Sequence, residues 1–282
     1  MNKKVLITAD STCDLSEDLL ERFGVKIIPL TIVLGEESFL DGNGFTVDDI
    51  YARYHKDGTL PKTAAPSIQQ FIDFFTPYVE QGYEIVHFDI SSELSATFNS
   101  AFIAAQELGG IYCIDSRALS GGVALLVIEA AECRDRGMSA AEIYEHVSAL
   151  VEKVDTSFIL DTLEFMWKGG RCSGVAALGA NLLKLKPALE MKNGKLEVYK
   201  KYRGNINAGY KQYIKERLAG KSVRPGHVFI INSGEVSDET LTELEAFVRE
   251  LTPVTEFHRG TAGCTISSHC GPKTLGVLFL NE

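Results

Sequence analysis

The stretch YEIVHFDISSELSATFNSAFIAAQE, residues 83–107, decides the fold that we predict for this chain. Residues 84–88 form an apolar run of strand length, and the apolar side chains after the turn recur at the spacing of a helix face. The turn between them contains Ser91, Ser92 and Ser95. A hydroxyl-rich turn before a helix exposes backbone N–H groups that can bind an anion. Capping of the helix is the alternative role for these serines.

The same alternation of strand and helix extends outward from this stretch. Apolar runs of strand length occur at residues 4–8, 25–34 and 111–114, and helical patterns follow them. Four such units predict a parallel sheet with helices on both faces. Ligands bind such sheets at the edge where the strands end. The loops that we expect to meet at that edge are residues 9–14, 89–95 and 115–121.

The pattern changes near residue 155. A helix is predicted over residues 175–185, and Asn193-Gly194 between two apolar runs predicts a β-hairpin. An antiparallel hairpin among helices implies a mixed sheet. We therefore predict an α/β fold with two α/β domains. Residues 1–155 form an N-terminal parallel sheet with helices on both faces, and residues 156–282 form a C-terminal domain with a mixed sheet.

Composition excludes several classes of function. The 282 residues include 38 acidic and 28 basic side chains, and this net negative charge argues against nucleic-acid binding. The chain lacks the apolar run of about 18 residues that a membrane helix needs, and its first residues are too short for a signal peptide. The six cysteines form no C-x-x-C pair, so we expect buried free thiols, a cytoplasmic protein and no metal site.

Three polar clusters suggest a binding site. Thr63 lies in a loop between two prolines, the serines lie at the strand-to-helix turn, and His269 lies just before a Gly-Pro turn. Hydroxyls and an imidazole suit the binding of an anionic head group through hydrogen bonds. A structural role is the alternative for His269. Gly170 and Arg171 form either a turn with a surface arginine or a phosphate-binding nest.

Motifs for nucleotide binding and for serine hydrolysis are missing. The chain contains neither a Walker A sequence nor a G-x-G-x-x-G fingerprint, and no G-x-S-x-G elbow. A catalytic serine would also need an adjacent base. We therefore assign no catalytic residue.

Seven short motifs occur along the chain, and together they resemble those of the DegV family of bacterial lipid-binding proteins. The motifs are TADSTCDL (residues 8–15), TAAPS (63–67), ISSELSAT (90–97), IDS (114–116), DTLE with KGGR (161–164 and 168–171), LKP (185–187) and HCGP (269–272).

This resemblance implies a two-domain α/β fold and a long-chain fatty acid as the ligand, with no cofactor. The acyl chain would occupy an apolar tunnel. The resemblance implies that Thr63, Ser92 or Ser91, and His269 hold the carboxylate, with Ser92 preferred over Ser91. Further candidate contacts are Ser95, Gly170 and Arg171. Phe71, Phe74 and Phe75 could line the tunnel, although aromatic residues at helical spacing are usually core.

Some members of the family are binding subunits of a fatty acid kinase. The resemblance therefore implies a partner, a separate ATP-binding kinase subunit related to dihydroxyacetone kinases, which makes the acyl phosphate. Basic residues that match the partner-facing region are Lys200, Lys201 and Arg203. The alternatives are a stand-alone hydrolase or phosphotransferase, and an interaction protein whose lipid is incidental. The chain departs from the family pattern at Ala96, Phe98 and Lys273, where Gly, Tyr and Gly are common.

Overall fold

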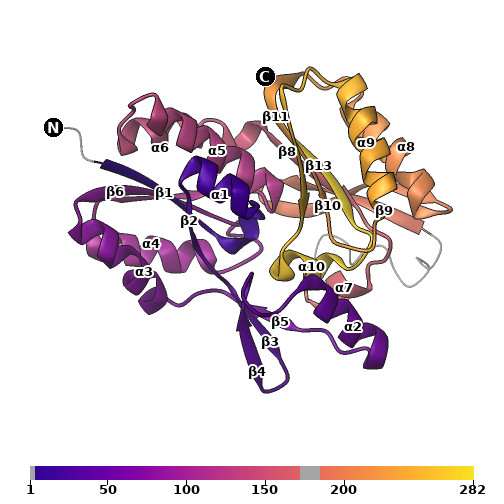
Figure 1. Ribbon diagram of the computed structural model, residues 1–282, viewed down its shortest axis with the longest axis horizontal. Helices are drawn as coiled ribbons and strands as arrows, with labels where there is room; N and C mark the ends of the chain where they lie inside the picture. The colour runs from indigo at the N-terminus through magenta and orange to yellow at the C-terminus, as the bar shows by residue number, and fades with distance from the viewer. Residues whose placement is uncertain (1–3, 172–184) are drawn as a thin grey trace.

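The computed structural model describes residues 4–171 and 185–282. The helix predicted over residues 175–185 lies outside this part of the chain, apart from Leu185, which begins a strand. Figure 1 shows an N-terminal part on the left, a C-terminal part on the right and a small sheet below them.

The first sheet is parallel, as predicted. Its strands lie in the order β2-β1-β6-β7. Helices α3 and α4 cover one face, α5 and α6 cover the other, and α1 packs on α5 (Figure 1). The elements are β1 (Lys4–Asp10), η1 (Ser11–Cys13), α1 (Glu17–Phe23), β2 (Lys26–Ile28), α3 (Ile68–Glu80), β6 (Tyr83–Asp89), α4 (Thr97–Leu108), β7 (Ile111–Asp115), α5 (Gly121–Asp135) and α6 (Ala140–Ser148).

Two predictions were wrong where the chain forms a small antiparallel sheet. The apolar run at residues 25–34 is not one strand, because the chain leaves the parallel sheet around Pro29 and enters the small sheet as β3. Thr63 does not lie in an irregular loop. It lies in β5, where it pairs with Ile32, and the prolines flank this short strand. The elements are β3 (Thr31–Leu34), β4 (Glu37–Leu40), α2 (Val47–Asp57) and β5 (Lys62–Ala64).

The third sheet is mixed, as predicted, and its strands lie in the order β10-β9-β8-β13-β11-β12. Only β11 and β12 pair in parallel. Asn193 and Gly194 form the predicted hairpin turn, both with positive φ. The elements are η2 (Val151–Lys153), β8 (Val154–Ile159), α7 (Glu164–Lys168), β9 (Leu185–Lys192), β10 (Lys195–Arg203), α8 (Ile206–Leu218), β11 (Val223–Asn232), α9 (Asp238–Leu251), β12 (Glu256–Thr261), α10 (Cys264–Cys270) and β13 (Leu275–Asn281).

Helix α5 joins the two large sheets. It packs on β1 and β6 of the parallel sheet and on β8, β11 and β13 of the mixed sheet. Twelve of its fifteen residues are buried, so it has no polar face. Close approach to the mixed sheet requires Gly122, because a Cβ there would lie 2.1 Å from Thr156 Oγ1. The two sheets therefore share one core, and the domain boundary at residue 155 stays a prediction.

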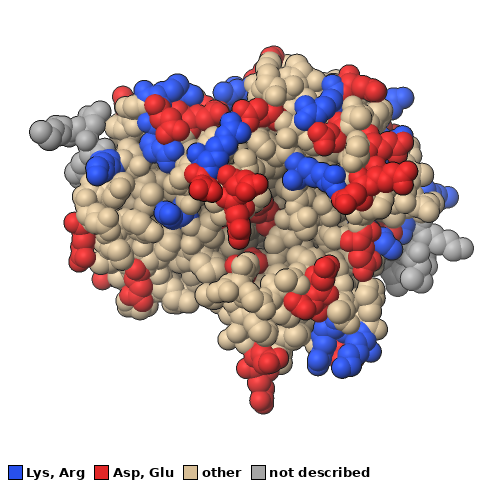
Figure 2. All heavy atoms as spheres, viewed as in Figure 1, with Lys and Arg blue, Asp and Glu red and all other residues tan. Residues whose placement is uncertain are grey.

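The charged side chains, the helices and the cysteines of the described residues can be compared with the composition. On the face shown in Figure 2, acidic and basic side chains intermingle, and the described residues form no continuous basic stripe there. None of the described helices combines the length and the apolarity that crossing a bilayer requires. The five cysteines in the described part of the chain are free and buried.

Candidate functional site

The loops at the carboxyl edge of the parallel sheet meet, as predicted. The Ile90 backbone N–H donates to Asp10 Oδ2 at 2.9 Å. The Ser91 backbone N–H donates to the Ala118 carbonyl at 2.9 Å. Asp10 thereby holds the serine turn against the first strand, and the site is built on these fixed loops.

Helix α10 is fixed to the same edge by two carboxylates. The N–H groups of Gly263 and Cys264 donate to Asp14 Oδ1 and Asp41 Oδ1, both at 2.8 Å. The Thr265 N–H donates to Asp41 Oδ2 at 3.3 Å. These carboxylates satisfy the free N–H groups of the helix N-terminus. This end of α10 is therefore closed to an anionic ligand, and its other end carries His269.

His269 bonds to Thr63, 206 residues earlier in the chain. His269 Nε2 lies 2.8 Å from Thr63 Oγ1. Burial, together with the nearby positive charge of Arg171, lowers the pKa of His269 to about 4, so the imidazole is neutral at pH 7. Gly169 packs against the ring, and a Cβ at this position would lie 2.2 Å from His269 Nδ1. The glycine is therefore needed for the histidine to sit there.

The neutral imidazole carries its proton on one nitrogen. His269 Nδ1 is buried and has no hydrogen-bond partner among the described residues. A buried N–H without a partner is rarer than an unpaired acceptor, so we assign the proton to Nε2. Nε2–H then donates to Thr63 Oγ1. The Thr63 hydroxyl proton is left free to donate to a ligand.

Thr63 and His269 line a cavity of about 540 Å³, part of which is open to solvent, and we call it the Thr63 cavity. Its walls are polar around Thr63 and apolar elsewhere. The polar lining consists of Thr63, Ser95, Arg171, Thr265 and His269, and the apolar lining includes Leu30, Ile90, Leu94, Leu119, Met166, Leu196 and Ile266.

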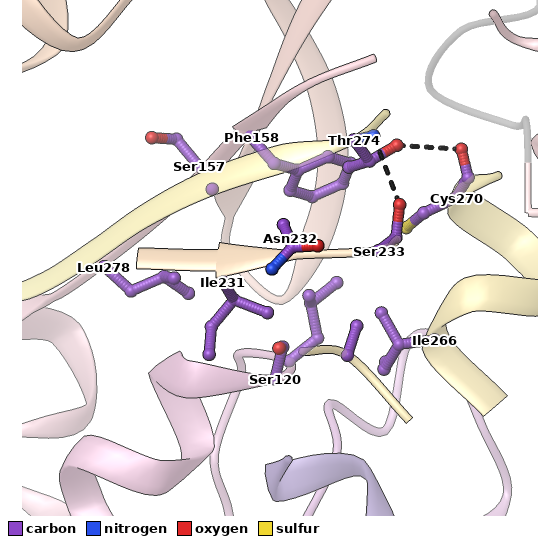
Figure 3. A pocket seen from close by; sticks show the side chains of 13 residues that line it. Ser120, Ser157, Phe158, Ile231, Asn232, Ser233, Ile266, Cys270, Thr274 and Leu278 are labelled. Carbon is purple, nitrogen blue, oxygen red and sulfur yellow. Dashed lines mark hydrogen bonds between the residues drawn. The ribbon is translucent and has the colours of Figure 1, made fainter. Parts of the chain in front are cut away.

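A second cavity of about 320 Å³, part of which is open to solvent, adjoins the first, and we call it the Phe158 cavity. Leu119, Ile266 and Cys270 line both cavities. Figure 3 shows the Phe158 ring facing the space, with the side chains of Ile231 and Leu278 nearby.

The polar groups around the Phe158 cavity bond to the protein. Thr274 Oγ1 donates to the Cys270 carbonyl at 3.0 Å, and Ser157 Oγ lies 2.8 Å from Tyr213 Oη. The Phe158 cavity is therefore suited to an apolar group.

The Thr63 cavity also continues toward the surface. Leu94, Arg171 and Leu196 line both this cavity and a surface hollow of about 880 Å³, whose wall also contains the charged side chains of Glu93, Lys195 and Glu197. The Thr63 cavity thus adjoins the charged surface hollow on one side and the apolar Phe158 cavity on the other.

The three predicted serines have different surroundings. Ser91 Oγ donates to the Gly194 carbonyl at 2.7 Å and is buried. Ser92 Oγ donates to Asp115 Oδ2, and its N–H donates to Asp115 Oδ1 at 3.1 Å. Of the three, only Ser95 lines the Thr63 cavity. Contact of Ser92 with a ligand stays a prediction. The geometry favours Ser95 as the serine that contacts a ligand, because Ser95 lines the cavity.

Gly170 and Arg171 form a turn with an arginine at the cavity wall. Gly170 has a φ of +72°. The N–H groups of Gly170 and Arg171 donate to the carbonyls of Trp167 and Met166, so they form no anion nest. The Arg171 guanidinium bonds to the Gly169 carbonyl at 2.9 Å and supplies a positive charge between cavity and surface.

Thr265 was missed by the sequence analysis. Thr265 is 4% exposed and lines the Thr63 cavity, and within residues 4–171 and 185–282 its hydroxyl has no hydrogen-bond partner. It precedes His269 by one helical turn, so the two side chains lie on one face of α10. The sequence offered no signal for Thr265, because the short helix α10 was not predicted.

The phenylalanines of α3 belong to the hydrophobic core and not to the candidate site. Phe71 and Phe75 are fully buried in the cluster beneath the parallel sheet, and they do not line the two cavities.

The predicted partner-facing residue Arg203 is exposed at the end of β10. It lies about 26 Å along the strand from Lys195 at the surface hollow. Lys200 forms an ion pair with Glu216.

Comparison with known proteins identifies the family. The family model described as uncharacterised protein, DegV family, matches residues 4–282. The chain belongs to the DegV family. A DegV domain-containing protein of Caldanaerobacter subterraneus is 31% identical, over 98% of this chain and 99% of the relative. One from Clostridium perfringens is 30% identical over 99% of both chains.

Solved DegV structures share the fold. A DegV family protein from Thermus thermophilus, described by its fatty acid binding, has a TM-score of 0.88 at 29% identity and covers 100% of both chains. A stearic acid-binding protein from Eubacterium ventriosum has a TM-score of 0.82 at 28% identity, with 98% of this chain and 97% of that chain covered. Structures of DegV relatives that bind fatty acids therefore match this chain along its whole length.

Proposed function

We propose that this DegV protein binds one long-chain fatty acid, with its carboxylate in the Thr63 cavity and its acyl chain in the Phe158 cavity. The observation that carries the proposal is that the cavity lined by Thr63 and His269 adjoins an apolar cavity, with Leu119, Ile266 and Cys270 in the walls of both. Fatty acid binding by the Thermus thermophilus relative supports it.

The head group meets hydroxyl donors and one cation. The Thr63 hydroxyl, positioned by His269, donates to one carboxylate oxygen, and Ser95 donates as well. Thr265 offers a further hydroxyl donor, which has no other hydrogen-bond partner among the described residues. A buried hydroxyl without a partner is destabilising, so a hydrogen bond to the ligand is favourable. Arg171 adds charge stabilisation at the outer side. Ser91 and Ser92 hold the turn in place through Gly194 and Asp115.

The tail supplies most of the affinity. Each buried CH₂ group contributes about 0.8 kcal/mol, so a chain of about 16 carbons gains on the order of 10 kcal/mol before the entropy cost of binding. A ligand held in this way stays bound during purification. No cofactor is needed for this function.

Native mass spectrometry tests the proposal. The freshly purified protein is expected to carry close to one fatty acid per chain, identified after organic extraction. Thr63→Val, Ser95→Ala and Thr265→Val each remove one donor, so each is expected to weaken palmitate binding by about tenfold.

The matched control is Ser92→Ala, which removes a hydroxyl that does not line the cavity and keeps the backbone N–H bond from residue 92 to Asp115, so the turn stays in place and palmitate is expected to bind within about threefold of the wild type. Purified protein that carries no lipid and takes up none from a fatty acid solution would contradict the function. A larger loss in Ser92→Ala than in Ser95→Ala would overturn the choice of serine.

We further propose that the protein presents the bound acid to a separate kinase subunit in the cytoplasm and does not itself turn over ATP. The opening at the surface hollow lies beside Arg171, so the head group is the part of the ligand nearest to a partner. Exposed Arg203 is the proposed partner contact.

Reconstitution with an ATP-binding kinase subunit tests this role. The complete mixture is expected to form acyl phosphate, whereas either protein alone forms none. Arg203→Glu is expected to reduce product formation at least tenfold with palmitate binding unchanged, and Arg249→Glu, a charge reversal on α9, serves as the control. ATP turnover by this chain alone would instead support the stand-alone enzyme.

A further inference from the structure

Two histidines and a glutamate meet at the edge of the mixed sheet. His227 lies on β11, and Glu256 and His258 lie on the edge strand β12, where Glu256 is the register partner of His227. Residues two apart on a strand point to the same face, so Glu256 and His258 lie together. His227 Nδ1 lies 2.8 Å from His258 Nε2 and 3.9 Å from Glu256 Oε2. All three side chains are half-buried, which leaves access for an ion.

The surroundings orient the two imidazole rings. Glu132 Oε1 on α5 lies 3.0 Å from His227 Nε2, so this carboxylate accepts the Nε2 proton and leaves the Nδ1 lone pair facing His258. Carboxylates hold metal-binding histidines in this way. The His258 ring stacks on Phe229, with ring centroids 4.5 Å apart, and on His227, at 5.1 Å. The rings are thus held in place by groups outside the cluster.

From this geometry we propose a binding site for one divalent transition-metal ion, with Zn²⁺ as the probe. The ligands are His227 Nδ1, His258 Nε2 and one Glu256 oxygen, and water completes the tetrahedron. Zn–N bonds of about 2.0–2.1 Å in a tetrahedral site place two nitrogens about 3.3 Å apart. On binding the ion, the distance of 2.8 Å between His227 Nδ1 and His258 Nε2 therefore increases by about half an ångström. His258 then carries its proton on Nδ1.

The site is separate from the fatty acid site. His227 precedes Asn232, which lines the Phe158 cavity, by about 16 Å along β11. A bound ion would join β11 to β12 and, through Glu132, to α5. Its function is therefore stabilisation or regulation of the contact between the mixed sheet and the N-terminal helices.

Arg22 opposes the ion. Its guanidinium donates to both oxygens of Glu256, at 2.7 and 3.0 Å, and adds a positive charge beside the site. A second cluster, Glu129 with Cys133 and His146, is less suitable, because Arg136 lies 3.0 Å from Cys133 Sγ and Arg224 lies 3.1 Å from Glu129. The two guanidinium groups at the second cluster repel a cation. The histidine cluster has one guanidinium group beside it, that of Arg22, and of the three proposed ligands this group contacts only Glu256.

Titration calorimetry with ZnCl₂ on untagged, chelator-treated full-length protein tests the site. We expect one ion per chain with micromolar affinity. His227→Gln and His258→Gln should each weaken binding at least tenfold, and Glu132→Gln should weaken it by about 10–100-fold, as expected for a carboxylate that orients a ligand. Arg22→Gln should tighten binding, because it frees Glu256 and removes a like charge.

The controls separate this site from other zinc ligands. His55→Gln changes an exposed histidine that bonds Glu235 elsewhere on the surface, and Cys133→Ser alters the second cluster. Both should bind Zn²⁺ like the wild type, with unchanged circular dichroism in all variants. Absence of saturable binding up to about 100 μM Zn²⁺, or a folded His258→Gln variant with wild-type affinity, would overturn the proposal.

Discussion

Replacing Ile266 with Phe is expected to abolish the binding of long-chain acids while short-chain acids still bind. Ile266 lines both cavities, so a larger side chain there is expected to block an acyl chain that extends from one into the other. Palmitate would lose the burial of about eight CH₂ groups, or roughly 6 kcal/mol, which corresponds to a loss of affinity on the order of 10,000-fold. Octanoate has no long tail to place beyond the Thr63 cavity, so it is expected to bind within about threefold of the wild type.

Calorimetric titration of delipidated protein with both acids measures this effect. The added volume in a packed interior costs about 1–3 kcal/mol of stability, so thermal unfolding must show that the variant is folded. Ile266→Leu keeps the volume and should bind both acids normally. Undiminished palmitate binding would refute the path of the acyl chain, and an equal loss of octanoate would show that the head-group site had been damaged.

Replacing Arg217 with Met is expected to produce the largest loss of stability. Arg217 on α8 is buried, with Nε 2.6 Å from Asp155 Oδ1 and Nη1 2.6 Å from Glu190 Oε2. It therefore joins a helix to β8 and β9. Removing the guanidinium leaves buried Asp155 without its closest cation, and breaking such a pair costs about 3–5 kcal/mol.

Urea unfolding measures this loss of stability. The matched control is Lys221→Met, because Lys221 Nζ also bonds Asp155, at 2.9 Å, but its side chain is 37% exposed. Its loss should cost about 1 kcal/mol or less. Adding Asp155→Asn to Arg217→Met should restore part of the stability, because it removes the uncompensated charge. A change below about 1 kcal/mol in Arg217→Met would show that water or another cation replaces the guanidinium.

Local patterns were sufficient for the general architecture. The alternation around residues 83–107 led to a parallel sheet with helices on both faces, and Asn193-Gly194 led to the hairpin of a mixed sheet. The meeting of three loops at one sheet edge also followed, because parallel strands end on the same side. Periodicity and turn chemistry depend on neighbouring residues, which is why the sequence is enough to predict them.

Short segments were harder to predict from the sequence. Strand β5 has three residues and α10 has seven, too few to show a clear period. Pairing with β3 makes Thr63 a strand residue, and carboxylates from Asp14 and Asp41 hold α10. Both elements depend on partners far away in the chain, so their own composition does not reveal them.

The sequence by itself determined the family and the class of fold, since the family's short motifs and the alternation of strands and helices can be read without coordinates. Tertiary structure alone joined Thr63 to His269 across 206 residues and placed Ser95 rather than Ser92 at the cavity wall. It also brought His227 to Glu132 and His258. A hydrogen bond depends on the final positions of two side chains, and long-range packing sets those positions.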